Sequence, residues 1–189
     1  QKELGGTLRA LAAGGRDVFY RGDVARRIAA YAAEHGGLLT LEDFECYRGQ
    51  WTAPITGSYR GHELYQAPPN SQGFTGILTA HILENFDLKA ADHGTFEYYH
   101  LIVEAIKRSF ADRDRYLTDP DFADIPLDRL LSKEYAAELA GEIDRKRALP
   151  ARTEPVGSDT AYAAVVDGEG NAVSFIQSLY FEYGSAVTA

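Results

Sequence analysis

Thr160 carries a hydroxyl at the start of a β-type segment, directly after a polar stretch with prolines and a glycine. A threonine hydroxyl is a weak nucleophile until a base removes its proton. Cleavage between Asp159 and Thr160 would give Thr160 a free α-amino group, whose pKa of about 7.7–8.0 leaves an appreciable unprotonated fraction near neutral pH. One residue would then supply nucleophile and base, a known variant of the catalytic triad. A threonine that merely favours β geometry is the simpler alternative.

A second hydroxyl is predicted to face Thr160 across a β-hairpin. Two β-type segments are joined by the polar turn 167–171. A three-residue hairpin loop needs a left-handed residue at its third position, and Gly170 supplies one at no steric cost. In that register Thr160 lies opposite Ser178, with both side chains on one face. A two-residue loop would instead set Gln177 opposite Thr160; the position of Gly170 favours the first register.

The residues before this hairpin are predicted to be mainly helical. Apolar residues recur at helical spacing from Thr95 to Arg115, the longest such pattern in the chain. Shorter helices are expected at 6–13, 24–34, 74–85 and 132–147, with a short one after Thr40, and β-type runs are expected at 51–58 and 62–67. Four polar residues are suited to begin helices as caps, namely Asp23, Thr40, Ser71 and Ser132.

The segment 149–159 differs from its neighbours, because it is polar and contains two prolines and one glycine. Such a composition is typical of an exposed linker. The sequence therefore divides into a helical-rich part (1–148), a linker that leads to the processing site (149–159) and the start of a β-sheet (160–189). We expect an α+β fold in which a mainly helical N-terminal part precedes a β-hairpin.

Composition excludes several classes of function. The chain has 189 residues, 45% of them hydrophobic and 25% charged, which indicates one folded domain of ordinary size. Its formal net charge of -9 argues against a nucleic-acid partner, because phosphate contacts need clustered Lys and Arg. The same charge gives no reason to expect an anionic membrane as partner. The sequence has no charged-then-apolar leader and no long apolar span.

Metal and cofactor signals are weak throughout the sequence. The five histidines form no His-Glu-x-x-His pattern, and the single cysteine, Cys46, has no partner for a disulfide or a zinc site. The acidic residues near Pro120 lack the glycine and terminal glutamate of an EF-hand. No Gly-x-Gly-x-x-Gly or P-loop pattern is present. We therefore expect neither a metal nor a cofactor.

The sequence from Asp159 to Tyr180 resembles the start of the small subunit in the γ-glutamyltransferase family of N-terminal-nucleophile (Ntn) hydrolases. The family pattern has a Thr followed several residues later by Val-Val-Asp-x-x-Gly-Asn-Ala-Val, and this chain matches it from Thr160 to Val173. Earlier segments resemble the same family, so the resemblance covers essentially the whole chain: Phe19–Gly22, Gly36–Asp43, Ala67–Gly73, Ile82–Phe86 and Ala111–Pro120.

This resemblance implies part of an αββα sandwich and a precursor that cuts itself between Asp159 and Thr160. It further implies that Thr160 then attacks γ-glutamyl amides such as glutathione and forms a γ-glutamyl-enzyme intermediate. The family normally has a threonine as the second hydroxyl against the nucleophile, and Ser178 occupies that position here. The resemblance thus assigns catalysis to Thr160 and Ser178, with no metal and no cofactor.

One departure from the family concerns the substrate. Members that process glutathione carry an asparagine two residues after the second hydroxyl, where it contacts the substrate, and this chain has Tyr180. A bulky phenol at a substrate-binding position leaves two alternatives open. One is a glutaryl or cephalosporin-type acylase of the same family. The other is a catalytically dead member that serves as a binding or structural domain.

The chain is also expected to be a piece of a longer precursor, because it contains no Met and starts at Gln1. The resemblance implies that the oxyanion hole and two substrate-binding residues belong to the missing remainder. Loss of one oxyanion donor costs on the order of 100–1000-fold in rate, so the piece alone should be essentially inactive. The expected partners are that remainder and a small γ-glutamyl or acyl-amide substrate. Formation of a homo-oligomer and the compartment, cytoplasmic or periplasmic and secreted, stay open.

Overall fold

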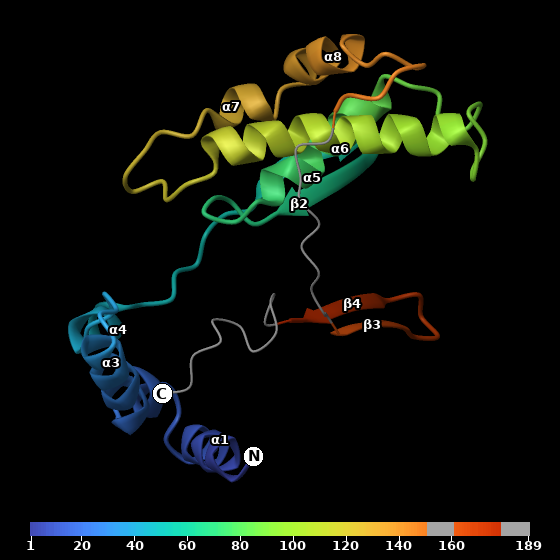
Figure 1. The fold of residues 1–189 in the computed structure, drawn as a ribbon. Coiled ribbons are helices and arrows are strands. Elements are labelled where there is room, and N and C mark those ends of the chain that lie inside the picture. Colours follow the sequence, from blue (N-terminus) through green and yellow to red (C-terminus); the bar gives the residue numbers. More distant parts are fainter. Residues whose placement is uncertain (151–160, 179–189) are drawn as a thin grey trace. The chain divides into compact units, whose positions relative to one another are not determined.

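The computed structural model describes residues 1–150 and 161–178, which fall into two compact units. One unit contains residues 50–153 and the other contains residues 1–49 together with 154–189. Figure 1 shows the elements of both. None of the described helices is long and apolar enough to cross a bilayer.

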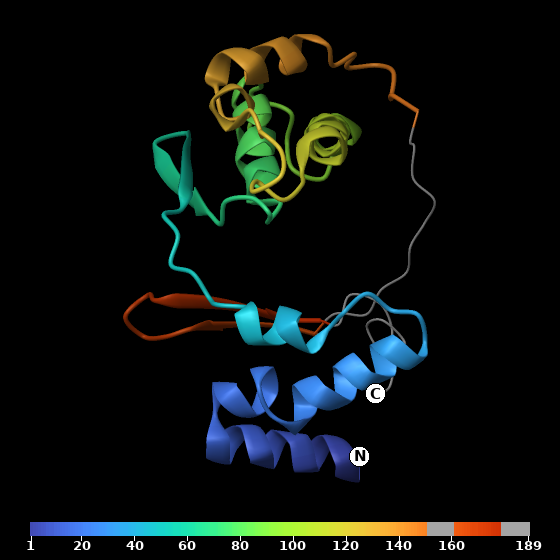
Figure 2. The same cartoon turned by 90° about the vertical axis from the view of Figure 1, so that its left-hand side faces the viewer.

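The first unit, residues 50–153, is built around a central helix. Its elements are β1 (Ile55–Tyr59), β2 (His62–Gln66), α5 (Gly73–Glu84), α6 (Phe96–Tyr116), α7 (Leu127–Leu130) and α8 (Lys133–Gly141). The α5 helix buries side chains on several sides, since it packs against the β1–β2 hairpin as well as against α6 and α8. Figure 2, which looks nearly along α6, shows α5 passing beside it. A helix with apolar residues all round is the expected centre of such a unit.

The core of this unit joins three helices. Leu78 and Ile82 from α5, Leu101 from α6 and Ala136 from α8 are fully buried and form one apolar cluster. Close approach of β1 to α5 depends on Gly57, since a Cβ at that position would lie only 2.3 Å from Ile77 Cγ2.

The second unit, residues 1–49 and 154–189, contains four short helices and a second hairpin. Its helices are α1 (Lys2–Gly14), α2 (Arg16–Tyr20), α3 (Asp23–Glu34) and α4 (Leu41–Cys46), and its strands are β3 (Ala161–Val166) and β4 (Ala172–Gln177). Thr40 caps α4 in a capping box, accepting a hydrogen bond from the Asp43 N–H while the Asp43 carboxylate accepts one from the Thr40 N–H. The predicted cap at Thr40 is thus confirmed.

Two other predicted caps are wrong. Asp23 is already the first residue of α3, with Gly22 at the cap position. Ser71 does not cap α5, because Gln72 holds the cap position and makes no side-chain cap hydrogen bond. The predicted strand from Trp51 begins only at Ile55, directly after Pro54, whose nitrogen has no hydrogen to donate to a ladder.

The predicted helix over 132–147 is too long. Ser132 caps α8 as expected, by accepting a hydrogen bond from the Tyr135 N–H, but the helix ends at Gly141. The residues that follow, 142–149, make hydrogen bonds to α6 instead of continuing the helix. Tertiary contacts therefore override a local helical pattern at this point.

Candidate active site

The β3–β4 hairpin has the register that a three-residue loop predicts. Ala161 pairs with Gln177 at one end of the ladder and Val166 pairs with Ala172 at the other. Gly170 has a φ of 86°, the left-handed conformation that the turn requires. The two-residue alternative, which would set Gln177 opposite Thr160, is excluded because Gln177 already faces Ala161.

Asp167 holds the turn of this hairpin through its carboxylate. The backbone N–H groups of Glu169 and Asn171 each donate to Oδ1 at 2.9 Å, and the side-chain amide of Asn171 donates to Oδ2 at 2.8 Å. The hydrogen bonds from Asn171 hold the pKa of the Asp167 carboxyl below its usual range. These bonds stabilise the three-residue loop, and the length of the loop sets the register of both strands.

Ser178 directly follows β4 and is exposed. The other three predicted site residues, Asp159, Thr160 and Tyr180, lie outside the described residues. The structure therefore confirms the hairpin register from which we predicted that Thr160 faces Ser178. The roles of all four residues stay predictions.

Both faces of the β3–β4 hairpin carry exposed apolar side chains. Residues with even numbers share one face and include Val166 and Ile176, whereas Val165 and Phe175 lie on the other; each of these four is more than half exposed. A sheet with one face in water normally alternates apolar and polar residues, and strands with apolar residues on both faces are typical of sheets covered on both sides. An isolated two-stranded hairpin is also marginally stable. The apolar side chains on both faces of this hairpin are therefore suited to packing against further protein.

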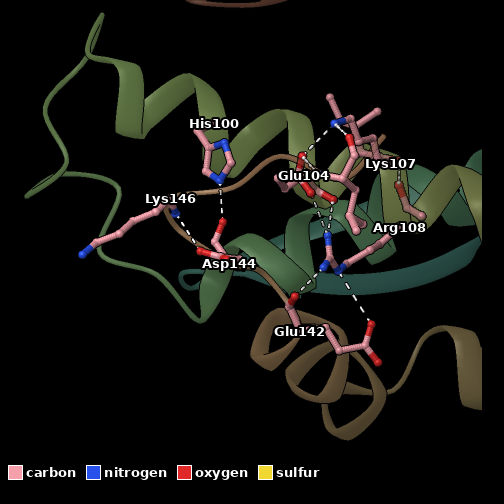
Figure 3. A network of polar contacts seen from close by, with 10 residues as sticks. His100, Glu104, Lys107, Arg108, Glu142, Asp144 and Lys146 are labelled. Carbon is pink, nitrogen blue, oxygen red and sulfur yellow. Dashed lines mark hydrogen bonds and ion pairs between the residues drawn. The ribbon is translucent and has the colours of Figure 1, made fainter. Parts of the chain in front are cut away.

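A polar network in the other unit joins α6 to the segment 142–149, and Figure 3 shows it. Glu104 is 1% exposed, and its carboxylate accepts hydrogen bonds from Lys107 at 2.7 Å and from Arg108 at 3.1 Å. Burial alone would raise the pKa of Glu104, but the bonds from the two cations hold it below its usual range. Arg108 in turn donates to the carbonyl of Glu142 at 2.6 Å.

Sequence reasoning missed this network. The signal available was the spacing of Glu104, Lys107 and Arg108, which places opposite charges at i, i+3 and i, i+4 on one helix. That spacing predicts surface ion pairs, but it gives no sign that the carboxylate is buried or that a distant segment binds it. The contribution of the segment 142–149 is visible only in the structure.

Two further buried polar side chains, His81 and Asp112, make hydrogen bonds between elements of this unit. The ring of His81 is 2% exposed, and its Nε2 accepts a hydrogen bond from the Ser58 N–H at 3.3 Å. Burial lowers the pKa of His81, and the nearby Lys133 lowers it further. Asp112 accepts the Tyr135 hydroxyl at 2.9 Å; burial raises the pKa of both groups, that of Tyr135 to about 12. These pairs join elements of one unit and show no geometry for catalysis.

In residues 1–150 and 161–178, no group of three or more His, Cys, Asp or Glu side chains is arranged to hold a metal ion. A cavity of about 190 Å³ lies among Tyr20, Leu39, Asp43, Phe44 and Tyr47. It is smaller than the pockets of about 300–1,000 Å³ that hold small molecules. Asp43, its one charged residue, is already engaged in the α4 capping box.

Comparison with known proteins identifies the family of the chain. The sequence profile of the family Gamma-glutamyltranspeptidase matches residues 1–189. The glutathione hydrolase-like YwrD proenzyme of Bacillus subtilis is 61% identical over 189 residues, which are 100% of this chain and 36% of that protein. The glutathione hydrolase proenzyme of Escherichia coli is 38% identical over 197 residues, covering 100% of this chain and 34% of that protein. The chain thus spans about a third of the length of these relatives.

The fold has solved counterparts as well. The crystal structure of cephalosporin acylase from Bacillus halodurans matches with a TM-score of 0.75 and 41% identity, over 93% of this chain and 32% of that one. The prediction of an α+β fold that forms part of an Ntn hydrolase is therefore confirmed. The match of the family profile to the whole chain and the identity to these relatives show that the chain belongs to the γ-glutamyltranspeptidase family.

Proposed function

We propose that this chain is part of a proenzyme that cleaves itself between Asp159 and Thr160 and then uses Thr160 to hydrolyse or transfer γ-glutamyl amides. The observation that carries the proposal is the register of the β3–β4 hairpin, in which Ala161 pairs with Gln177. Continued by one pair, that register would bring the hydroxyls of Thr160 and Ser178 together on one face.

Self-cleavage needs no further reactant than water. The hydroxyl oxygen of Thr160 attacks the carbonyl carbon of Asp159, the hydroxyl proton passes to the leaving nitrogen as the peptide C–N bond breaks, and the acyl group moves from nitrogen to oxygen. Water then hydrolyses the ester, which leaves a carboxylate on Asp159 and a free α-amino group on Thr160. In its unprotonated form this amine accepts the hydroxyl proton in later turnovers.

Turnover repeats the same chemistry on a substrate. Thr160 attacks the γ-carbonyl carbon, its proton passes to the α-amino group, and the leaving amine takes that proton as the C–N bond breaks. Water or an amino acid then accepts the γ-glutamyl group from the threonine oxygen. In this scheme Ser178 donates a hydrogen bond to the Thr160 oxygen and orients it for attack.

Tyr180 favours a second candidate substrate class. A phenol where family members that process glutathione have an asparagine would fill space near the substrate's α-amino acid end. A substrate with a glutaryl group, which lacks the α-amino group, is therefore the alternative. It is supported by the 41% identity to a cephalosporin acylase.

We also propose that the remainder of the precursor is the partner of this chain. The two apolar faces of the β3–β4 hairpin need covering, and the curated relatives are about three times longer than the chain. Val165, Phe175 and Ile176 would contact that remainder. The pocket would then be complete only in the full-length protein, so the 189 residues alone would show no turnover.

The test is intact-mass measurement of the full-length precursor during incubation after purification. We expect two products whose boundary lies before Thr160, none from Thr160→Ala, and normal products from Thr153→Ala, a matched threonine change in the linker. Cleaved protein is then assayed with a γ-glutamyl anilide and a glutaryl amide, which separates the two substrate classes. A precursor that stays intact and turns over neither substrate would support the catalytically dead alternative instead.

A further inference from the structure

Leu149 is held through its backbone by one turn of α6. Its N–H donates to Oε1 of Glu104 at 3.2 Å, and its carbonyl accepts a hydrogen bond from Nζ of Lys107 at 2.7 Å. Lys107 and Glu104 also bond to each other at 2.7 Å, so the three groups close a ring of hydrogen bonds. We call this arrangement the Leu149 bracket.

The bracket is the last of a series of contacts between α6 and the segment 142–149. Arg108 donates to the Glu142 carbonyl at 2.6 Å, and His100 donates to the Asp144 carbonyl at 2.7 Å. Most of these contacts reach backbone atoms, as Figure 3 shows for His100, Arg108 and their partners. The backbone of this segment is therefore held by side chains of α6, while Ile143 in the core and Arg145, paired with Glu97, add contacts from the segment's own side chains.

The buried position of Glu104 makes the bracket more than a surface ion pair. A carboxylate that is 1% exposed must have its charge compensated, and here two cations and a backbone N–H do so. Exposed ion pairs are worth little because water competes for them. Hydrogen bonds to a charged group inside the protein are stronger, so Leu149 is fixed firmly on α6.

Holding both the N–H and the carbonyl of one residue fixes the direction in which the chain leaves it. The next residue is Pro150, whose ring restricts φ to about −65°. Thr160 follows Leu149 by eleven positions. The bracket thus determines where, and in which direction, the connection to the proposed scissile bond begins.

We propose that Glu104 and Lys107 are positioning residues for self-cleavage, which they promote by anchoring the upstream end of the connection to Thr160. The inference rests on the proposed function. Without the bracket, the last contact with α6 would be that of Arg145 with Glu97, fifteen positions before Thr160. The probability that a connection brings its ends together falls with about the −3/2 power of its length. Loss of the anchor should therefore slow cleavage by about 1.6-fold.

The positioning role ends when the precursor is cleaved, so the test compares the rate of cleavage with the kinetics of the processed enzyme. Once the Asp159–Thr160 bond is broken, Leu149 and Thr160 belong to different chains, so the bracket no longer acts on the nucleophile. A variant of Lys107 should lower the rate of cleavage and leave kcat and KM of the fully processed enzyme unchanged. A residue that only stabilises the fold would lower the unfolding midpoint or change kcat as well.

The experiment compares Lys107→Met, Lys107→Arg and Lys146→Met in the full-length precursor. Lys107→Met removes the donor to the Leu149 carbonyl, whereas Lys107→Arg keeps one. Lys146→Met removes the same charge from a lysine of the anchored segment that takes no part in the bracket. We expect cleavage about 1.6-fold slower in Lys107→Met only, with normal kcat and KM after processing. Cleavage at the wild-type rate, or an equal fall in kcat, would overturn the proposal.

Hydrogen exchange separates failure of this inference from failure of the proposed function. In the Thr160→Ala precursor, which is not expected to cleave, a peptide covering 143–150 should exchange faster when Lys107→Met is added than when Lys146→Met is added. If the wild-type precursor does not cleave at all, the proposed function fails, and this exchange still tests the anchor. Equal exchange in both variants would show that no bracket holds Leu149.

Discussion

The helical core of residues 50–153 and the β3–β4 hairpin bury their apolar side chains to opposite degrees. Leu78, Ile82 and Leu101 are fully buried within their own unit, whereas Val165 and Phe175 of the hairpin are more than half exposed. Both regions have well-defined local geometry, with capped helices in one and a closed turn in the other. The first region is therefore stabilised by its own core. The hairpin, next to which the proposed catalytic residues lie in the sequence, needs further protein to bury its apolar side chains.

The largest effect is expected from truncating the core. Leu101→Ala in the full-length precursor should lower the free energy of unfolding by about 2–5 kcal/mol, because it leaves a cavity between α5, α6 and α8. The isosteric Leu101→Ile should cost less than about 1.5 kcal/mol. Urea unfolding measures both. Similar values for the two variants would mean that the side chain is not packed as the structure shows.

A smaller loss is expected where β1 approaches α5. In Gly57→Ala, the added Cβ would lie 2.3 Å from Ile77 Cγ2 and 2.9 Å from His81 Nε2, so we expect destabilisation of about 1–3 kcal/mol from overpacking. Gly76→Ala is the matched control on α5, since its Cβ would meet only Nε2 of Gln66, at 4.0 Å, and should stabilise the helix by about 0.5–1 kcal/mol. Opposite signs in urea unfolding are the expected result, and equal signs would contradict it.

The hairpin turn should respond next. Gly170→Ala forces a side chain into the left-handed conformation at φ 86°, at a cost of roughly 1–2 kcal/mol. Gly168→Ala, with open space and no such φ, should change little. Hydrogen exchange of peptides covering 161–178 measures the difference. If Gly170→Ala leaves exchange unchanged, the turn does not set the register.

The smallest effect is a dependence of stability on pH. Burial lowers the pKa of His81, so the unfolded chain binds more protons than the folded one when the pH falls below the ordinary histidine value of about 6.5. Stability from neutral His81 should be complete above that pH and decrease as the pH falls through the lowered folded value. His81→Gln should remove this part of the slope, while the exposed His35→Gln should keep it. Thermal unfolding at several pH values checks the sign.

The sequence predicted those parts of the molecule that local chemistry determines. Thr40 and Ser132 are confirmed as caps, and Gly170 indicated the three-residue turn and so the pairing of Ala161 with Gln177. The prediction of the site rested on that turn, because the length of a hairpin loop sets the register of its strands without tertiary contacts.

Contacts between distant segments could not be predicted in this way. The end of α8 at Gly141 and the burial of Glu104 both result from the segment 142–149 lying along α6, more than 30 positions away in sequence. A local pattern favours continuing the helix to 147, and nothing in it shows that α6 competes for the same backbone groups.

Mapping the acylated residue would show most directly whether Thr160 is the nucleophile. The processed full-length protein is mixed with a γ-glutamyl anilide, quenched in acid to preserve an ester, digested and analysed by tandem mass spectrometry. We expect one γ-glutamyl group on the peptide that begins with Thr160, and none in Thr160→Ala. Acylation of another residue, or turnover that persists in Thr160→Ala, would contradict this expectation.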